Sequence, residues 1–162
     1  MVLAQSLVAD AVGVFWLVAF ALVPGVVASI LWTPFLLARR IRSLFAALPP
    51  SGSAVPSFVI AGIGGSLPYV AVVAGVIGAV DPEGAAWSNA LLGAVVPLSA
   101  AYVLGGPVVA ALVLPRIGID WDPTGYGPST WALSLVASAW YAATLATPIV
   151  LMAFVFALPG GY

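Results

Sequence analysis

Four long apolar segments follow one another along the chain, at about residues 11–38, 57–80, 87–114 and 130–158. Each is longer than the roughly 20 apolar residues that a helix needs to cross a bilayer. None shows the alternation of apolar and polar positions that is typical of transmembrane strands, and an unpaired backbone cannot lie in hydrocarbon. The pattern predicts an all-α integral membrane protein, with one membrane domain over residues 1–162 and four transmembrane helices.

The link between the first two segments is amphipathic. Residues 39–48 place Ile41, Leu44, Phe45 and Leu48 at the i, i+3, i+4, i+7 spacing of one helical face. Arginines occupy much of the remainder. We therefore expect an interfacial helix whose apolar face enters the membrane surface and whose arginines reach lipid phosphates.

The few charged residues sort by side. The arginines follow the first and third segments, at Arg39, Arg40, Arg42 and Arg116. The acidic residues at the opposite segment ends are Asp10, Asp81 and Glu83. Loops that carry positive charge are retained in the cytoplasm. The sequence thus predicts a multipass protein of the cell membrane, with cytoplasmic arginine-bearing loops and both termini outside.

Composition narrows the chemistry. The chain is 64% hydrophobic and 6% charged, and it contains no Cys, His or Lys. These absences exclude thiolate metal sites, imidazole bases and Schiff-base lysines. A net charge of −1 gives no reason to expect nucleic acid as a partner. We expect no catalysis, no metal and no cofactor, although a bound lipid would leave no signature in the sequence.

The loop before the last segment resembles a calcium loop only in part. Asp120, Asp122 and Gly125 match positions 1, 3 and 6 of an EF-hand. Position 12 is Trp131, where calcium binding requires a bidentate Glu. An acidic turn is the better interpretation. An enzyme acting on lipids, the least supported alternative, would need these carboxylates or a tyrosine in a constellation that the sequence does not form.

Every apolar segment contains proline, which removes a backbone donor and bends a helix. Kinks are predicted at Pro24, Pro68, Pro97, Pro107 and Pro148. Such prolines either give a helix a static shape or form a hinge, as in the broken helices of transporters. Static shape is the expectation here.

Small residues recur at every fourth position, which lets helix backbones approach closely in a membrane. The predicted packing stripes are Ala21, Gly25 and Ser29; Ala71, Gly75 and Ala79; and Ser134, Ser138 and Ala142. They indicate tight packing, within the bundle or onto a partner. A shift of 73 residues aligns Pro24 with Pro97 and Pro34 with Pro107. This alignment adds the alternative of two tandem helical hairpins.

Tryptophans and hydroxyls complete the pattern. Trp16, Trp32, Trp87, Trp121 and Trp131 lie where an aromatic belt at the membrane surface is expected, whereas Trp140 lies deeper and should face protein. No charged residue lies within a segment core, which argues against proton relays and ion-coupled carriers. Serines and threonines at depth are expected to bond carbonyls of their own helices, with a polar pore lining as the alternative.

Acidic short loops, arginine without lysine, and spans rich in Ala, Val and Gly are found together here. With the stretch Ile119-Asp120-Trp121-Asp122-Pro123 before a last proline-containing span, they resemble small multipass membrane proteins of salt-adapted, haloarchaeal-type archaea. The resemblance is compositional. It implies a membrane location and a high-salt habitat, and no activity.

Two functions fit these observations. The first is a non-catalytic membrane subunit or scaffold that packs against other membrane proteins or itself. It is favoured by packing stripes, short loops and the lack of reactive groups. The alternative is a small oligomeric channel or facilitator for a solute, for which prolines, deep hydroxyls and the hairpin repeat would be used.

Overall fold

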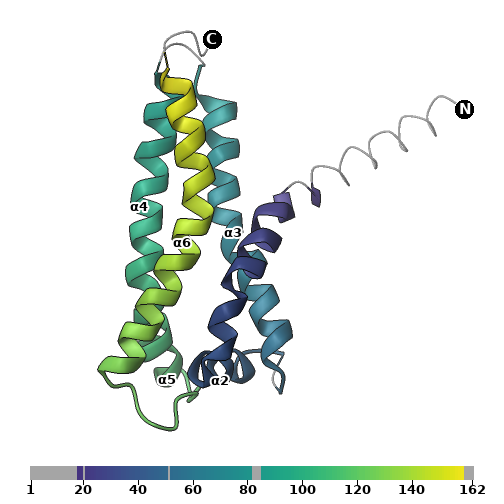
Figure 1. Cartoon of the computed structure of the whole chain (residues 1–162), viewed down its shortest axis with the longest axis vertical. Helices are drawn as coiled ribbons and strands as arrows, with labels where there is room; N and C mark the ends of the chain where they lie inside the picture. Colours follow the sequence, from purple (N-terminus) through teal and green to yellow (C-terminus); the bar gives the residue numbers. More distant parts are fainter. Residues whose placement is uncertain (1–17, 20, 51, 82–84, 159–162) are drawn as a thin grey trace, which may run out of the picture.

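The computed structural model describes residues 18–19, 21–50, 52–81 and 85–158. Within these ranges all regular structure is helical and no strand occurs, which confirms the all-α prediction. Three long helices stand side by side (Figure 1). They are α3 (Ala54–Ala79), α6 (Pro128–Ala157) and α4 (Ala86–Val108), which continues through a π-helical turn (Val109–Val113) into α5 (Leu114–Arg116).

These three helices, with α4 to α5 counted as one, are long and apolar enough to cross a membrane. Their outward faces are apolar as well: Ile60, Leu104 and Phe154 are each at least 60% exposed. Exposure of a large contiguous apolar surface is energetically unfavourable in water but not in lipid. The described structure is therefore compatible with a membrane protein.

The first apolar segment differs from the other three. A helix over residues 21–32 continues as a 3-10 helix (Thr33–Leu37) and then turns by 118° into α2 (Arg39–Ala47). Pro34 begins the 3-10 stretch and Ala38 is extended, so helical hydrogen bonding stops there. The bent pair gives a fourth span only if it is counted as one, and four transmembrane helices are not confirmed. Residues 11–17, with Trp16, lie outside the described residues, as do Asp10 and Glu83.

The internal prolines do not break their helices. Pro68 lies inside α3, Pro97 and Pro107 lie inside α4, and Pro148 lies inside α6, each within an uninterrupted element. The large bend lies instead between Leu37 and Arg39. Within the predicted repeat of residues 11–38 on 84–111, residues 33–37 form a 3-10 helix, whereas the aligned residues 106–110 continue the long helix, so the two repeats differ in shape there.

Tyrosines join α3 to its neighbours. Tyr102 of α4 donates to the Gly65 carbonyl, and Tyr141 of α6 donates to the Gly62 carbonyl. Tyr69 of α3 donates to Ser99 Oγ over 3.0 Å. Such bonds and close packing can hold helices together even where lipid surrounds them and gives little hydrophobic drive for association. Two backbone carbonyls of α3, those of Gly62 and Gly65, thus accept hydrogen bonds from hydroxyls of two other helices.

Candidate functional site

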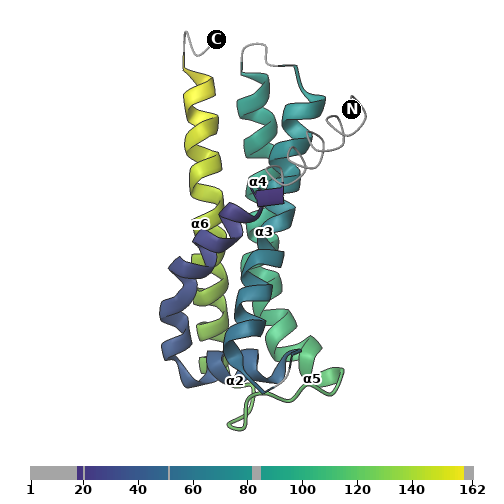
Figure 2. The same ribbon diagram turned by 90° about the vertical axis from the view of Figure 1, so that its right-hand side faces the viewer.

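One end of the bundle is closed by α2. Both α2 and α5, which together carry all four arginines, lie at the same end of the long helices (Figures 1 and 2). We call it the arginine end. The apolar face of α2 packs on the bundle: Ile41 and Phe45 are buried, next to Phe58 of α3 and Ala137 of α6. Two of the four positions expected to enter the membrane surface, Ile41 and Phe45, are therefore covered by the bundle itself, whereas Leu44 and Leu48 are half-buried.

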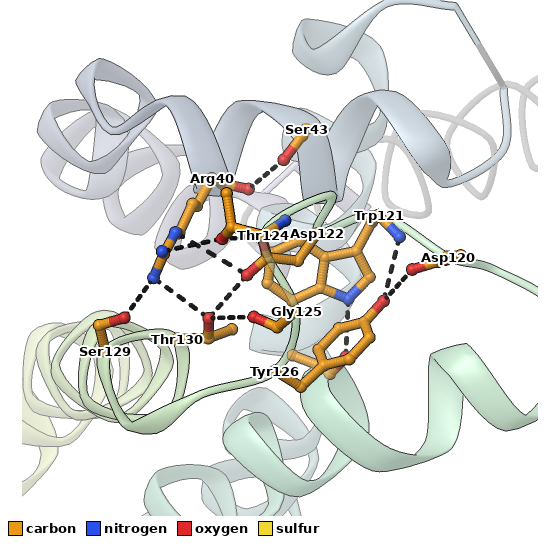
Figure 3. A network of polar contacts seen from close by, with 11 residues as sticks. Arg40, Ser43, Asp120, Trp121, Asp122, Thr124, Gly125, Tyr126, Ser129 and Thr130 are labelled. Carbon is orange, nitrogen blue, oxygen red and sulfur yellow. Dashed lines mark hydrogen bonds and ion pairs between the residues drawn. The ribbon is translucent and has the colours of Figure 1, made fainter.

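Arg40 ties α2 to the α5–α6 loop and the start of α6 (Figure 3). Its guanidinium donates to Ser129 Oγ at 2.6 Å, Thr124 Oγ1 at 2.9 Å and Thr130 Oγ1 at 3.2 Å. Its Nε lies 3.8 Å from Asp122 Oδ2. Arg40 therefore bonds within the protein, whereas it was predicted to face lipid. Arg39, Arg42 and Arg116 are exposed, which leaves the lipid-facing prediction open for them.

Asp122 is the centre of this network. Its side chain is fully buried, and it accepts bonds from Thr130 Oγ1 at 2.6 Å and Thr124 Oγ1 at 2.7 Å. Burial alone would raise the pKa of this carboxyl. The hydrogen bonds from Thr130 and Thr124 and the charge of Arg40 outweigh burial, so the pKa lies below its usual value of 3.8. The carboxylate form is stabilised, as a structural anchor requires.

A second anchor joins the same loop to the end of α4. In the π-helical turn the N–H of Leu114 reaches the Val109 carbonyl, five residues back. In that register the next donor would be Pro115, which has no N–H, so the Ala110 carbonyl loses its helical partner. The indole of Trp121 donates to that carbonyl over 2.7 Å. Trp121 is 3% exposed, so its predicted place in an aromatic belt is wrong.

Trp140 also departs from expectation. It was expected to face protein, yet it is 52% exposed on the outside of α6. Its indole N–H still donates to the Leu31 carbonyl over 3.0 Å. That carbonyl lies near Pro34, where regular helical bonding ends. Trp140 thus donates a hydrogen bond to the first segment, while its ring is half-exposed on the surface.

A cavity of about 470 Å³ lies above α2, between the first segment and helices α3, α4 and α6. We call it the inner cavity. Ile41, Leu44, Phe45 and Leu48 of α2 contribute to its lining, so the Arg40 network holds one of its walls. Trp32 stands in another wall, with its ring centre 4.8 Å from that of Tyr141.

A second hollow of about 650 Å³ lies further from α2, between the first helix, α3 and α6. Its lining includes Pro24, Val73, Ile77, Pro148 and Met152. Apart from Thr144 and Tyr69, the side chains along it are apolar. Thr144 already donates to the Trp140 carbonyl and Tyr69 donates to Ser99. This groove therefore offers no uncommitted polar group.

The predicted packing stripes have different surroundings. Gly25 and Ser29 meet α3, because a methyl group on Gly25 would lie 2.7 Å from Ile63 Cα and one on Gly62 would touch Ser29 Oγ. Ser138 of α6 packs against Gly106 of α4 in the same way, and Ala142 is 1% exposed. The remaining stripe, Ala71, Gly75 and Ala79 of α3, is exposed. It contacts no other element at Gly75.

The acidic side chains in the described part of the chain do not gather into a metal site. No group of three or more His, Cys, Asp or Glu side chains that could hold a metal occurs among these residues. Asp120 bonds to Tyr126 and Asp122 to its threonines, so both carboxylates of the loop serve structure. The burial of Asp122 was not predicted from the sequence, because an Asp in a short loop is ordinarily solvated.

In the residues that the structure describes, the fold and site define an all-helical protein with three helices long enough for a membrane, an amphipathic helix across one end, and two hollows with mostly apolar linings. The chain belongs to the family described as Domain of unknown function (DUF8162), whose profile matches residues 12–160. No curated protein and no solved structure matches it.

Proposed function

We propose that this protein is a non-catalytic integral membrane subunit that packs laterally against a helix of another membrane protein. In this proposal the three long helices and the bent first segment lie in the cell membrane. The arginine end faces the cytoplasm, as the positive-inside rule favours, and the C-terminal end of α6 faces outside. The salt-adapted habitat stays a prediction from composition.

The outer face of α3 carries the proposal. Ala71, Gly75 and Ala79 are exposed there, and a methyl group added to Gly75 or Gly78 would meet nothing within 4 Å. Small side chains do not strengthen contact with lipid chains. They do strengthen contact with a neighbouring helix, because the two backbones can approach and make dense van der Waals contact. The face has no charged residue, so the expected partner is an apolar transmembrane helix.

The experiment is gentle-detergent purification from native membranes, followed by native mass spectrometry of wild type and two variants. Gly75→Leu puts a large side chain on the outer face of α3. Gly93→Leu is the matched control, because Gly93 is an exposed glycine of α4 whose added methyl would also meet nothing. We expect another polypeptide at fixed stoichiometry with wild type and Gly93→Leu, and its loss with Gly75→Leu.

Two results would contradict this proposal. One is a wild-type protein that elutes alone and stays monodisperse and thermally stable. The other is the same co-eluting polypeptide in all three samples, which would place the contact elsewhere. A homo-oligomer would move support to the alternative of a small oligomeric channel or facilitator.

The channel alternative has less support from the deep hydroxyls. Ser29, Ser99 and Thr147 each donate to the carbonyl four residues back in their own helix. Hydroxyls committed in this way contribute little to a polar pore lining. A pore would have to lie between copies of the chain, and solute flux into liposomes is the assay that tests it.

A further inference from the structure

The inner cavity lies within the helix bundle near the arginine end. Its volume of about 470 Å³ is within the roughly 300–1,000 Å³ typical of small-molecule sites. Ala101 at its edge is exposed, so the cavity reaches the outside of the bundle. Aromatic rings of Trp32, Phe45, Tyr102 and Tyr141 contribute to its walls, and no charged residue lines it.

Most polar groups along the cavity are already committed. Trp32 donates to the Ala137 carbonyl at 2.9 Å, and Tyr102 donates to the Gly65 carbonyl at 2.6 Å. Tyr141 donates to the Gly62 carbonyl. These bonds tie the cavity walls to one another, so the aromatic side chains present their rings to the interior and not their polar atoms.

Two serines along the cavity, Ser134 and Ser138, make no hydrogen bond in the described structure, and Ser134 is the more deeply buried of the two. It is 5% exposed and lines the cavity, and its Oγ is buried without a hydrogen-bond partner in the described structure. Ser29 and Ser99, by contrast, each bond a carbonyl of their own helix, those of Gly25 and Val95. A buried hydroxyl left unbonded destabilises the fold unless something else bonds it.

The walls limit what that partner is. A charged ligand would be buried without a counter-charge, which is strongly unfavourable. Bulk water does not fill an apolar cavity. A purely hydrocarbon occupant would fill the space and leave Ser134 unsatisfied. An uncharged, mostly apolar molecule with one carbonyl or hydroxyl meets all three conditions.

We infer that the inner cavity is a binding site for an uncharged, membrane-soluble molecule whose carbonyl or hydroxyl bonds Ser134 Oγ. The aromatic rings and the apolar face of α2 hold its apolar body. This site is separate from the outer face of α3, so its test and the test of the proposed partner contact are independent.

The probe is 2-decyl-1,4-benzoquinone, titrated into the full-length protein in detergent micelles. A quinone quenches tryptophan fluorescence, and Trp32 stands in the cavity wall. The competitor is decylbenzene, which has a similar shape and no carbonyl. Gly105→Leu fills the cavity, because Gly105 lines it and an added methyl there would meet nothing within 4 Å. Gly93→Leu on the same helix is the control outside the cavity.

We expect saturable quenching in wild type and Gly93→Leu and its loss in Gly105→Leu. Ser134→Ala should weaken quinone binding about fivefold, the value of one ordinary hydrogen bond, while its melting temperature stays at or above that of wild type. Decylbenzene should compete poorly with the quinone in wild type and better in Ser134→Ala.

The inference would be overturned by the absence of saturable quenching in wild type, by equal quinone affinity in Gly105→Leu, or by equal affinity in Ser134→Ala. Decylbenzene that binds wild type as tightly as the quinone would also overturn it, since the cavity would then be a slot for hydrocarbon alone.

Discussion

Two stripes of small residues, one on the first helix and one on the outer face of α3, have opposite surroundings. Where the first helix crosses α3, a methyl group on Gly25 would lie 2.5 Å from Ser66 Oγ and 2.7 Å from Ile63 Cα. On the outer face, a methyl group on Gly75 would meet nothing within 4 Å. Both regions have the same four-residue spacing. The difference teaches that spacing identifies a surface able to pack closely, whereas the neighbouring backbone decides what packs there.

The largest effect is expected at the crossing. Gly25→Ala should lower the free energy of unfolding by about 3 kcal/mol, because the added methyl overlaps the backbone of α3 and the two helices must separate. Thermal melting followed by circular dichroism in detergent measures the loss. A melting temperature equal to that of wild type would show that the first helix does not pack on α3 in this way.

An intermediate effect is expected at the arginine end, which holds the same first segment through α2. Asp122→Asn should cost about 2 kcal/mol, because it weakens buried hydrogen bonds to a charged group and leaves Arg40 without its counter-charge. The same melting assay measures it. Thr124→Val removes the bonds of the Thr124 hydroxyl to Asp122 and Arg40 but keeps both charges, so its effect should be smaller.

The Asp122 network also predicts a pH dependence. The folded pKa lies below the ordinary 3.8, so the carboxylate contributes its stability above about pH 4. That contribution is lost as the pH falls below 3.8 through the lower folded pKa. Melting temperatures between pH 3 and 6 should fall at the acid end in wild type, and less in Asp122→Asn. Parallel curves for the two proteins would contradict this role of Asp122.

The smallest effect, with the opposite sign, is expected on the outer face of α3. Gly75→Ala should raise the free energy of unfolding by about 0.5–1 kcal/mol, because alanine favours the helix and the added methyl meets no described atom within 4 Å. Measured beside Gly25→Ala, it is the same substitution in two surroundings. An equal loss of stability in Gly25→Ala and Gly75→Ala would contradict the distinction between the crossing and the outer face.

Hydrophobic length predicted the helical class because each of the three long helices lies in one apolar segment. Surroundings were harder to predict. The apolar face of α2 has one spacing whether lipid or the bundle covers it, and Ile41 and Phe45 are buried by the bundle. The sequence predicts an exposed loop at Asp122 and Trp121, because it does not show that Arg40 of α2 reaches Asp122 or that the Ala110 carbonyl lacks a helical donor. In the sequence, Ser134 is one more small residue of a packing stripe. Only the structure shows that its buried Oγ lacks a hydrogen-bond partner.

The bond from Trp121 to the Ala110 carbonyl has a practical consequence for mapping this protein in cells. A hydrophilic loop between two membrane helices is the usual place to insert a reporter that marks the membrane side. Here the stretch from Trp121 to Thr130 completes the hydrogen bonding of one helix and fastens another to α2. A reporter inserted within it would unfasten the end of the bundle whose location it was meant to report.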